Sequence, residues 1–183
     1  MKRRSPFLLR SSRGFTLIEL AVTLSVAAIL FTAAVPSFVS LIRNTQITAT
    51  TNDFFAAINL ARAEAVQRGI RVDMVPAGEE GDWAQGWVVF IDKNRDQRAG
   101  DKDVIIFRHG PAPKGMHITA RLTDSTVQYL AYNGAGRTRT HDNGYRTQFG
   151  TFTFELESKV RKIKLNFIGR PRICNPEIDT DTC

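Results

Sequence analysis

The stretch RGFTLIEL, residues 13 to 20, opens a long apolar segment and places one glutamate, Glu19, inside it. This segment runs from Phe15 to Ile42, and Glu19 is its only charged residue. Its 28 residues are enough to span a bilayer, for which about 20 suffice. A carboxylate inside a membrane costs about 2.5 to 3.5 kcal/mol on insertion scales, so Glu19 indicates a partner within the membrane.

A basic segment, MKRRSPFLLRSSRG, precedes the apolar run and carries Lys and Arg but no acidic residue. The positive-inside rule leaves this segment in the cytoplasm and sends the C-terminal part of the chain across the membrane. An alternative interpretation is a secretory signal peptide that is cut after Thr32, Ala33 and Ala34. Glu19 interrupts the apolar stretch that a signal peptide requires, and the helical pattern continues past residue 34. Both features favour a single membrane-spanning helix.

The residues GFTLIE, 14 to 19, after a short basic leader resemble the signal of type IV pilins and type II secretion pseudopilins. The resemblance implies that a prepilin peptidase cuts after Gly14 and that Phe15 becomes an N-methylated first residue. It also implies that Glu19 pairs with the N-terminal amine of a neighbouring subunit during assembly. An ammonium and a carboxylate that meet in a low-dielectric medium satisfy each other. A leader of 14 residues is somewhat long for this family.

The helical pattern continues beyond the apolar run. Apolar or small residues recur every three or four positions and form one face that can pack on a globular domain. They are Ile47, Thr51, Phe54, Ile58, Ala61 and Ala65. Pro36 predicts a kink or local unwinding within the run. Glu64 and Arg68 are spaced as an exposed i,i+4 pair, and Gly69 suits the end of the helix.

Beyond Gly69 the chain changes to short β-rich runs separated by turn residues. The predicted strands are residues 70–75, 86–91, 104–108, 118–122, 126–132, 151–156 and 160–168. Their pattern is typical of antiparallel sheets, and their number suits two packed sheets. The prediction is an α+β chain with a type IV pilin-like fold, in which a long N-terminal transmembrane helix packs on an antiparallel two-sheet β domain.

Four segments follow from this interpretation. Residues 1–14 form the prepilin leader, and residues 15–42 form the transmembrane part of the helix. Residues 43–69 form its periplasmic amphipathic half. Residues 70–183 form the β-rich domain with a C-terminal arginine motif and a disulfide tail.

Two further stretches resemble the GspH/FimT branch of minor pseudopilins and minor pilins. They are NLARAEAVQRGIRV, residues 59 to 72, and GDWAQGWVVF, residues 81 to 90, with the polar loop that follows. The resemblance implies that Trp83 and Trp87 belong to the fold and not to a ligand site.

The loop from Asp92 to Asp103 resembles an EF-hand, because Asp, Asn and Asp occupy its first, third and fifth positions. The sixth position is Gln97 instead of glycine, and the twelfth is Asp103 instead of a bidentate glutamate. A polar hairpin loop is the favoured interpretation, and calcium binding stays open.

No other pattern nominates a catalytic or metal site. The three histidines, His109, His117 and His141, have no metal-ligand spacing. No G-x-S-x-G element is present. The chain is therefore predicted to be non-enzymatic and to need no cofactor.

The positive charge of the chain concentrates near its C-terminus. Without the leader the chain has 20 basic and 18 acidic residues, a net charge of +2. Residues 137–172 hold 9 basic and 3 acidic groups, whereas residues 173–183 hold 3 acidic groups and no basic one. The basic segment is the candidate for an anionic partner.

The motif GRPR, residues 169 to 172, lies in that segment. Pro171 favours extended geometry, so Arg170 and Arg172 can face the same way about 6 to 7 Å apart, a spacing that suits successive phosphates. GRPR also resembles the Gly-Arg-x-Arg motif with which FimT-type minor pilins bind DNA, which implies a role for Gly169, Arg170 and Arg172. The alternative is a solvated arginine pair at a strand end.

Three more arginines, Arg137, Arg139 and Arg146, can extend the basic patch. The two cysteines, Cys174 and Cys183, lie beyond the last predicted strand and in the periplasm are expected to form a disulfide. That bridge would pin the segment that follows GRPR.

The sequence thus predicts an inner-membrane minor pilin of the GspH/FimT type that binds double-stranded DNA without sequence preference for natural transformation. Its partners would be other major and minor pilins, the prepilin peptidase and the inner membrane, with the C-terminal domain in the periplasm. The alternative is a minor pseudopilin of a type II secretion system, or a pilus-priming subunit, that does not bind DNA.

Overall fold

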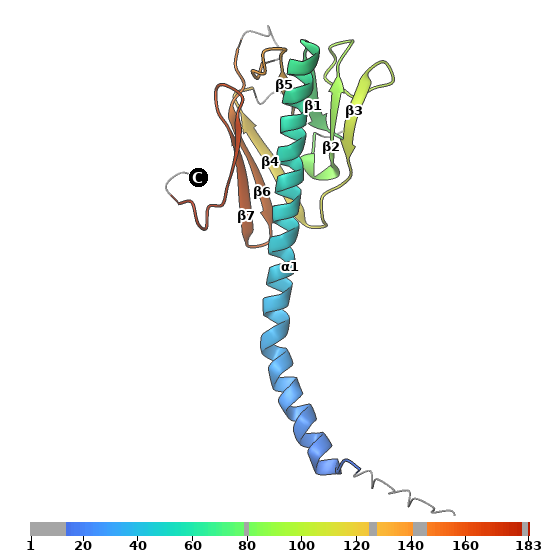
Figure 1. The fold of residues 1–183 in the computed structure, drawn as a ribbon, viewed down its shortest axis with the longest axis vertical. Coiled ribbons are helices and arrows are strands. Elements are labelled where there is room, and N and C mark those ends of the chain that lie inside the picture. Colours follow the sequence, from blue (N-terminus) through green and yellow to red (C-terminus); the bar gives the residue numbers. More distant parts are fainter. Residues whose placement is uncertain (1–13, 79–80, 125–127, 141–145, 181–182) are drawn as a thin grey trace, which may run out of the picture. The chain divides into compact units, whose positions relative to one another are not determined.

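The computed structural model describes residues 14–78, 81–124, 128–140, 146–180 and 183. The chain divides into two compact units, Met1–Leu41 and Ile42–Cys183. One long helix, α1 (Leu17–Arg68), contributes to both units. All strands found among the described residues belong to the second unit (Figure 1).

In the first unit, α1 begins directly after Thr16 with a reciprocal cap. The Thr16 backbone N–H donates to Glu19 Oε2 at 3.0 Å, and the Glu19 backbone N–H donates to Thr16 Oγ1 at 3.3 Å. This capping box satisfies backbone donors that a helix start leaves without partners. The helix continues without a break through Pro36, so of the two outcomes predicted there, a kink or local unwinding, the unwinding does not occur.

The N-terminal part of α1 is apolar on all sides, and its large hydrophobic side chains are exposed. By length and composition α1 is able to cross a membrane. Glu19 is the one acidic residue in the first turn of this helix.

The second unit holds two antiparallel sheets. The first sheet has the strand order β3-β2-β1-β5, formed by β1 (Val72–Pro76), β2 (Trp87–Ile91), β3 (Val104–His109) and β5 (Leu130–Tyr132). The second has the order β4-β6-β7-β8, formed by β4 (Met116–Leu122), β6 (Gly150–Leu156), β7 (Lys159–Leu165) and β8 (Pro171–Cys174). A short 3-10 helix, η1 (Trp83–Gln85), precedes β2.

The predicted fold class is confirmed, because a long helix packs on two antiparallel sheets. Seven predicted strands correspond to β1 to β7, with ends shifted by a few residues; part of the predicted strand 126–132 lies outside the described residues. The prediction missed β8, and Cys174 lies within this strand instead of beyond the last one. β8 has only four residues and begins with a proline, so it forms because β7 offers an edge to pair with.

The core lies between the C-terminal half of α1 and both sheets. The predicted helix face is confirmed, since each of its six members is buried: Ile47, Thr51, Phe54, Ile58, Ala61 and Ala65. Phe54 lies at the centre of this helix face. The centroid of its ring is 4.8 Å from that of Trp87 and 4.9 Å from that of Phe152. One helical residue therefore joins the two sheets.

Sequence expectations for the end of α1 also hold. Arg68 Nε lies 2.6 Å from Glu64 Oε2, and Gly69 follows the helix with a φ of +67°. Trp83 and Trp87 are buried in the core at 1% and 0% exposure, as expected of residues that belong to the fold.

Candidate nucleic-acid interface

The turn between β7 and β8 presents the GRPR motif, and Asn166 builds this turn. The Asn166 side-chain oxygen accepts hydrogen bonds from the backbone N–H groups of Ile168 at 3.1 Å and Arg170 at 2.9 Å. The Asn166 backbone also exchanges hydrogen bonds with the turn, since its carbonyl accepts from Gly169 and its N–H donates to the Arg170 carbonyl. The backbone that carries Arg170 is therefore fixed by local bonds.

Gly169 attaches this turn to the core. Its carbonyl oxygen accepts a 2.7 Å hydrogen bond from the hydroxyl of Tyr132, a fully buried residue of β5. A Cβ atom at residue 169 would lie 3.0 Å from both Thr138 N and the Tyr132 ring, and φ is +80°. Glycine is thus required both by conformation and by the close approach of Thr138.

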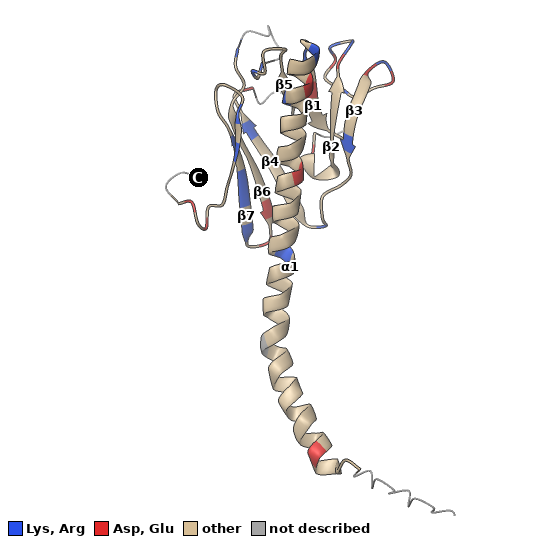
Figure 2. Ribbon diagram, viewed as in Figure 1, with Lys and Arg blue, Asp and Glu red and all other residues tan. Residues whose placement is uncertain are grey.

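Arg170 and Arg172 are both exposed. In the ladder between β7 and β8, Arg172 lies opposite Lys164, while Arg170 lies beside Asn166 at the turn. Arg172 belongs to β8, whereas Arg170 belongs to the turn immediately before this strand. Figure 2 shows further basic residues along β7.

The structure brings a second basic segment next to the motif. Thr138 lies against Gly169, and its neighbours Arg137 and Arg139 are exposed and half-buried respectively. Arg139 Nη1 donates to the Thr138 carbonyl at 3.0 Å. The exposed Arg146 lies next to this segment, because its backbone carbonyl accepts a hydrogen bond from the backbone N–H of Thr140.

Sequence reasoning missed the residues that position the motif: Asn166, Tyr132 and Thr138. No local pattern marks Tyr132 or Thr138, because they meet Gly169 only in the folded chain. An asparagine three residues before a glycine, between two extended runs, is a turn signal that could have identified Asn166.

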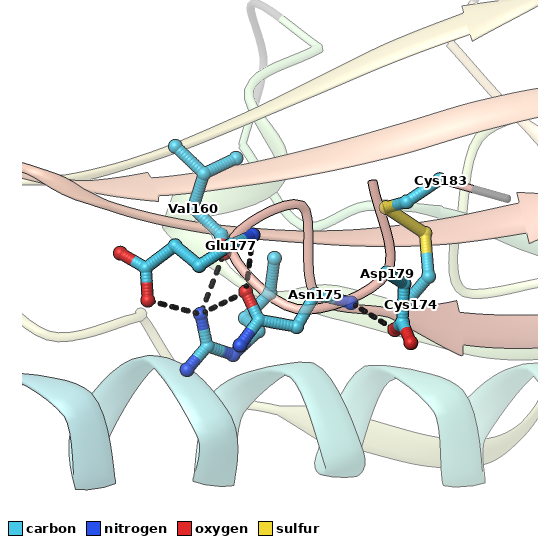
Figure 3. The surroundings of a disulfide bond; sticks show 7 residues. Val160, Cys174, Asn175, Glu177, Asp179 and Cys183 are labelled. Atoms are coloured by element: carbon cyan, nitrogen blue, oxygen red, sulfur yellow. Dashed lines mark hydrogen bonds and ion pairs between the residues drawn. A yellow bond between two sulfur atoms is a disulfide. The ribbon is translucent and has the colours of Figure 1, made fainter. Parts of the chain in front are cut away.

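The C-terminal tail is held by a disulfide between Cys174 and Cys183 (Figure 3). Asn175 N–H donates to Asp179 Oδ2 at 2.9 Å inside the loop that the disulfide closes. The buried Arg161 of β7 also holds the tail, donating to Asn175 Oδ1 at 3.0 Å. Arg161 donates in addition to the side chain of Asn44, so the same guanidinium contacts α1, β7 and the tail.

The predicted loop after β2 brings together the carboxylates of Asp92, Asp96 and Asp103, whose ligand atoms lie within 4.8 Å of one another. Backbone N–H groups already bind these oxygens: Asp92 accepts from residues 95 and 97, and Asp103 accepts from residues 93 and 100. These bonds account for the carboxylate positions as part of the loop itself. The residues fit a polar hairpin loop.

The described histidines lie apart from one another in the fold. The ring of His109 stacks on Trp87 with centroids 3.9 Å apart, whereas His117 is exposed on β4. His141 lies outside the described residues.

Gly14 and Phe15, the predicted cleavage pair, are exposed ahead of α1.

Two family models match the chain. The model described as Type II transport protein GspH matches residues 50–169, and the model described as Prokaryotic N-terminal methylation motif matches residues 9–35. A comparison with curated protein sequences finds no match.

Solved structures of pilin-like proteins resemble this fold. Two crystal forms of the type IV minor pilin FimU of Pseudomonas aeruginosa are 15% and 16% identical, with TM-scores of 0.57 and 0.54. They cover 73% and 71% of this chain and 92% and 94% of their own. The minor pseudopilin EpsH from the Type 2 Secretion System of Vibrio cholerae is 12% identical, with a TM-score of 0.51, and covers 72% of this chain and 98% of its own.

At such identities the solved structures establish the fold, whereas the match to residues 50–169 establishes the family. The chain belongs to the GspH family, carries an N-terminal methylation motif and has the fold of minor pilins and minor pseudopilins.

Proposed function

We propose that this protein is a minor pilin of a type IV pilus that binds double-stranded DNA without sequence preference during natural transformation. The observation that carries the proposal is the exposed arginine pair, with Arg170 on a turn that Tyr132 attaches to the core and Arg172 on the strand that follows. A rigid backbone reduces the entropy lost when the pair binds phosphates. Phosphate contacts carry no sequence information, which suits uptake of any DNA.

The neighbouring arginines support the same partner. Arg137 and Arg146 are exposed, and Arg137 and Arg139 flank Thr138, which lies against Gly169. The described carboxylates of the tail have partners of their own: Glu177 pairs with Lys159 at 3.2 Å, and Asp179 accepts from Asn175. The local surface therefore favours an anionic ligand.

The decisive experiment replaces Arg170 and Arg172 by Gln in the full mature chain in a non-ionic detergent. Binding to a labelled duplex, measured by fluorescence anisotropy, should be micromolar or weaker for the parent and decrease steeply with salt. Loss of two phosphate contacts should reduce the log-log salt slope by about 1.8. Transformation should fall with DNA binding, while pilus assembly should persist.

A matched control replaces Lys102 and Arg108, two exposed basic residues of the first sheet and its loop, by Gln. This variant should bind DNA as the parent does. If the parent binds no duplex even at low salt, the protein is instead a pseudopilin of a type II secretion system or a pilus-priming subunit. Binding by the Arg170 and Arg172 variant equal to that of the parent would move the site to Arg137, Arg139 and Arg146.

The same proposal includes membrane insertion with the C-terminal domain in the periplasm, cleavage by a prepilin peptidase and assembly with other pilins. The five basic residues of the leader and the apolar segment after it support this orientation. Mass spectrometry of the purified protein should find N-methylated Phe15 as the first residue. Cleavage after Ala34 would refute the pilin interpretation.

A further inference from the structure

The outer face of the second sheet carries a row of basic side chains that the sequence does not reveal. Cross-strand pairing aligns Arg121 of β4 with Thr151 of β6, Thr151 with Lys164 of β7, and Lys164 with Arg172 of β8. Residues directly opposite one another in antiparallel strands lie on the same face. Four strands thus contribute one row across the whole sheet, and three of its four members are basic.

Burial shows which face this is. Arg121 and Arg172 are exposed, and Thr151 and Lys164 are half-buried. The residues that alternate with them, such as Phe152, Ile163 and Leu165, are buried in the core. The row therefore lies on the side of the second sheet that faces away from α1.

We propose that this row, Arg121, Thr151, Lys164 and Arg172, extends the arginine motif into a track for the phosphate backbone of duplex DNA. Three strand spacings of about 4.8 Å separate Arg172 from Arg121, about 14 Å in all. One strand of a duplex has a phosphate every 3.4 Å or so along the axis, so the track lies opposite about four phosphates. The inference rests on the DNA binding proposed above and adds Arg121 and Lys164 to the site.

The row also predicts how a bound duplex is oriented relative to the strands of the second sheet. Arg170 lies at the turn that precedes β8, and Arg172 begins the row, so Lys164 and Arg121 continue it across the sheet. The adjacent row is less basic, with Thr119, Thr153 and Lys162 as its members on β4, β6 and β7. The third row includes Glu155 of β6, an exposed carboxylate that repels phosphate. A duplex bound to this face should therefore follow the first row, across the strands.

Two complementary variants of the full mature chain test the track, with duplex binding measured against salt in a non-ionic detergent. Arg121→Gln combined with Lys164→Gln should reduce the log-log salt slope by about 1.8, one phosphate contact each. Thr151→Lys places a charge between Lys164 and Arg121 and should make the log-log salt dependence steeper, raising the magnitude of its slope by about 0.9. The Lys102→Gln and Arg108→Gln control removes the same kinds of charge from the first sheet and its loop and should leave the slope unchanged.

The outcomes separate this inference from the proposed function. A slope unaltered by either row variant, together with a loss of binding on replacing Arg170 and Arg172, overturns the track and leaves DNA binding by the motif intact. An equal decrease of the slope in the control also overturns it, because the effect would then report net charge. Absence of binding by the parent overturns both. Unchanged melting temperatures exclude misfolding as the cause of a lower slope.

Discussion

The hydroxyl of Tyr132 donates a 2.7 Å hydrogen bond to the carbonyl oxygen of Gly169 and so connects β5 of the first sheet to the turn between β7 and β8 of the second. The Tyr132 ring also lies where a side chain at residue 169 would have to go. The conformation of the arginine motif is therefore set by the core of the domain.

Gly169→Ala should destabilise the protein by more than 1 kcal/mol and weaken DNA binding although both arginines remain. The added methyl group meets Thr138 and Tyr132 at 3.0 Å, and φ is +80°. Gly115→Ala is the control, because φ there is +83° but nothing lies within 4 Å. Urea unfolding, followed by tryptophan fluorescence, compares the two variants. An equal loss of stability would rule out the close contact with Thr138 and Tyr132 as the cause of the destabilisation.

Tyr132→Phe should lower the free energy of unfolding by about 1 kcal/mol at neutral pH, because it removes one hydrogen bond. Burial raises the pKa of Tyr132. A raised pKa in the folded state means that the folded chain holds this proton more tightly, so the stabilisation is complete below the unfolded value of about 10 and decreases as the pH rises above it.

The difference in unfolding free energy between parent and Tyr132→Phe should therefore be constant from pH 6 to 9 and shrink above about pH 10. Urea titrations at each pH provide the measurement. Comparison with the Phe variant cancels the titration of lysines, which both proteins share. A constant difference in unfolding free energy up to pH 11 would contradict a raised pKa of Tyr132 in the folded chain.

Arg161→Met should cost about 2 to 4 kcal/mol, because it removes a buried guanidinium that donates to the side chains of Asn44 and Asn175. Lys162→Met is the control on the neighbouring, half-buried position of the same strand. Urea unfolding should show a large loss for the first variant and a small one for the second. Similar losses would mean that Arg161 acts only through packing of its stem.

Replacing Cys174 and Cys183 together by Ser should lower stability by at most about 3 kcal/mol. DNA affinity should change less than twofold, because pairing with β7 holds Pro171 to Cys174 in place. The reduced parent serves as a second form without the bridge. A large loss of DNA binding with little change in melting temperature would give the disulfide the positioning role that the sequence suggested.

Glu19→Ala should leave leader cleavage nearly intact but impair incorporation into the filament. Because Glu19 also caps α1 through Thr16, Glu19→Gln is the informative partner: glutamine preserves a capping box but has no charge. Failure of both variants in filament purification supports pairing with a subunit amine. Normal assembly of the Gln variant alone would reduce the role of Glu19 to capping.

Most of the architecture of this protein can be predicted from local patterns in its sequence. The apolar run with Glu19 predicts a membrane helix, the spacing from Ile47 to Ala65 predicts the face that packs on the domain, and the alternation after Gly69 predicts antiparallel strands. These features are local, since hydrophobic period and turn chemistry act over a few residues. The arginine pair is identified as a candidate site by its charge and by the resemblance of GRPR to the motif of FimT-type minor pilins.

The way in which the arginine motif is held, and the basic row beside it, depend on tertiary contacts. β8 exists because it pairs with the edge of β7, and Gly169 is restricted by Tyr132 and Thr138, which are more than 30 residues away in sequence. Likewise, Arg121 and Lys164 join Arg172 through strand register across β6. Register depends on long-range pairing, and a one-residue shift would move every one of these side chains to the other face of the sheet.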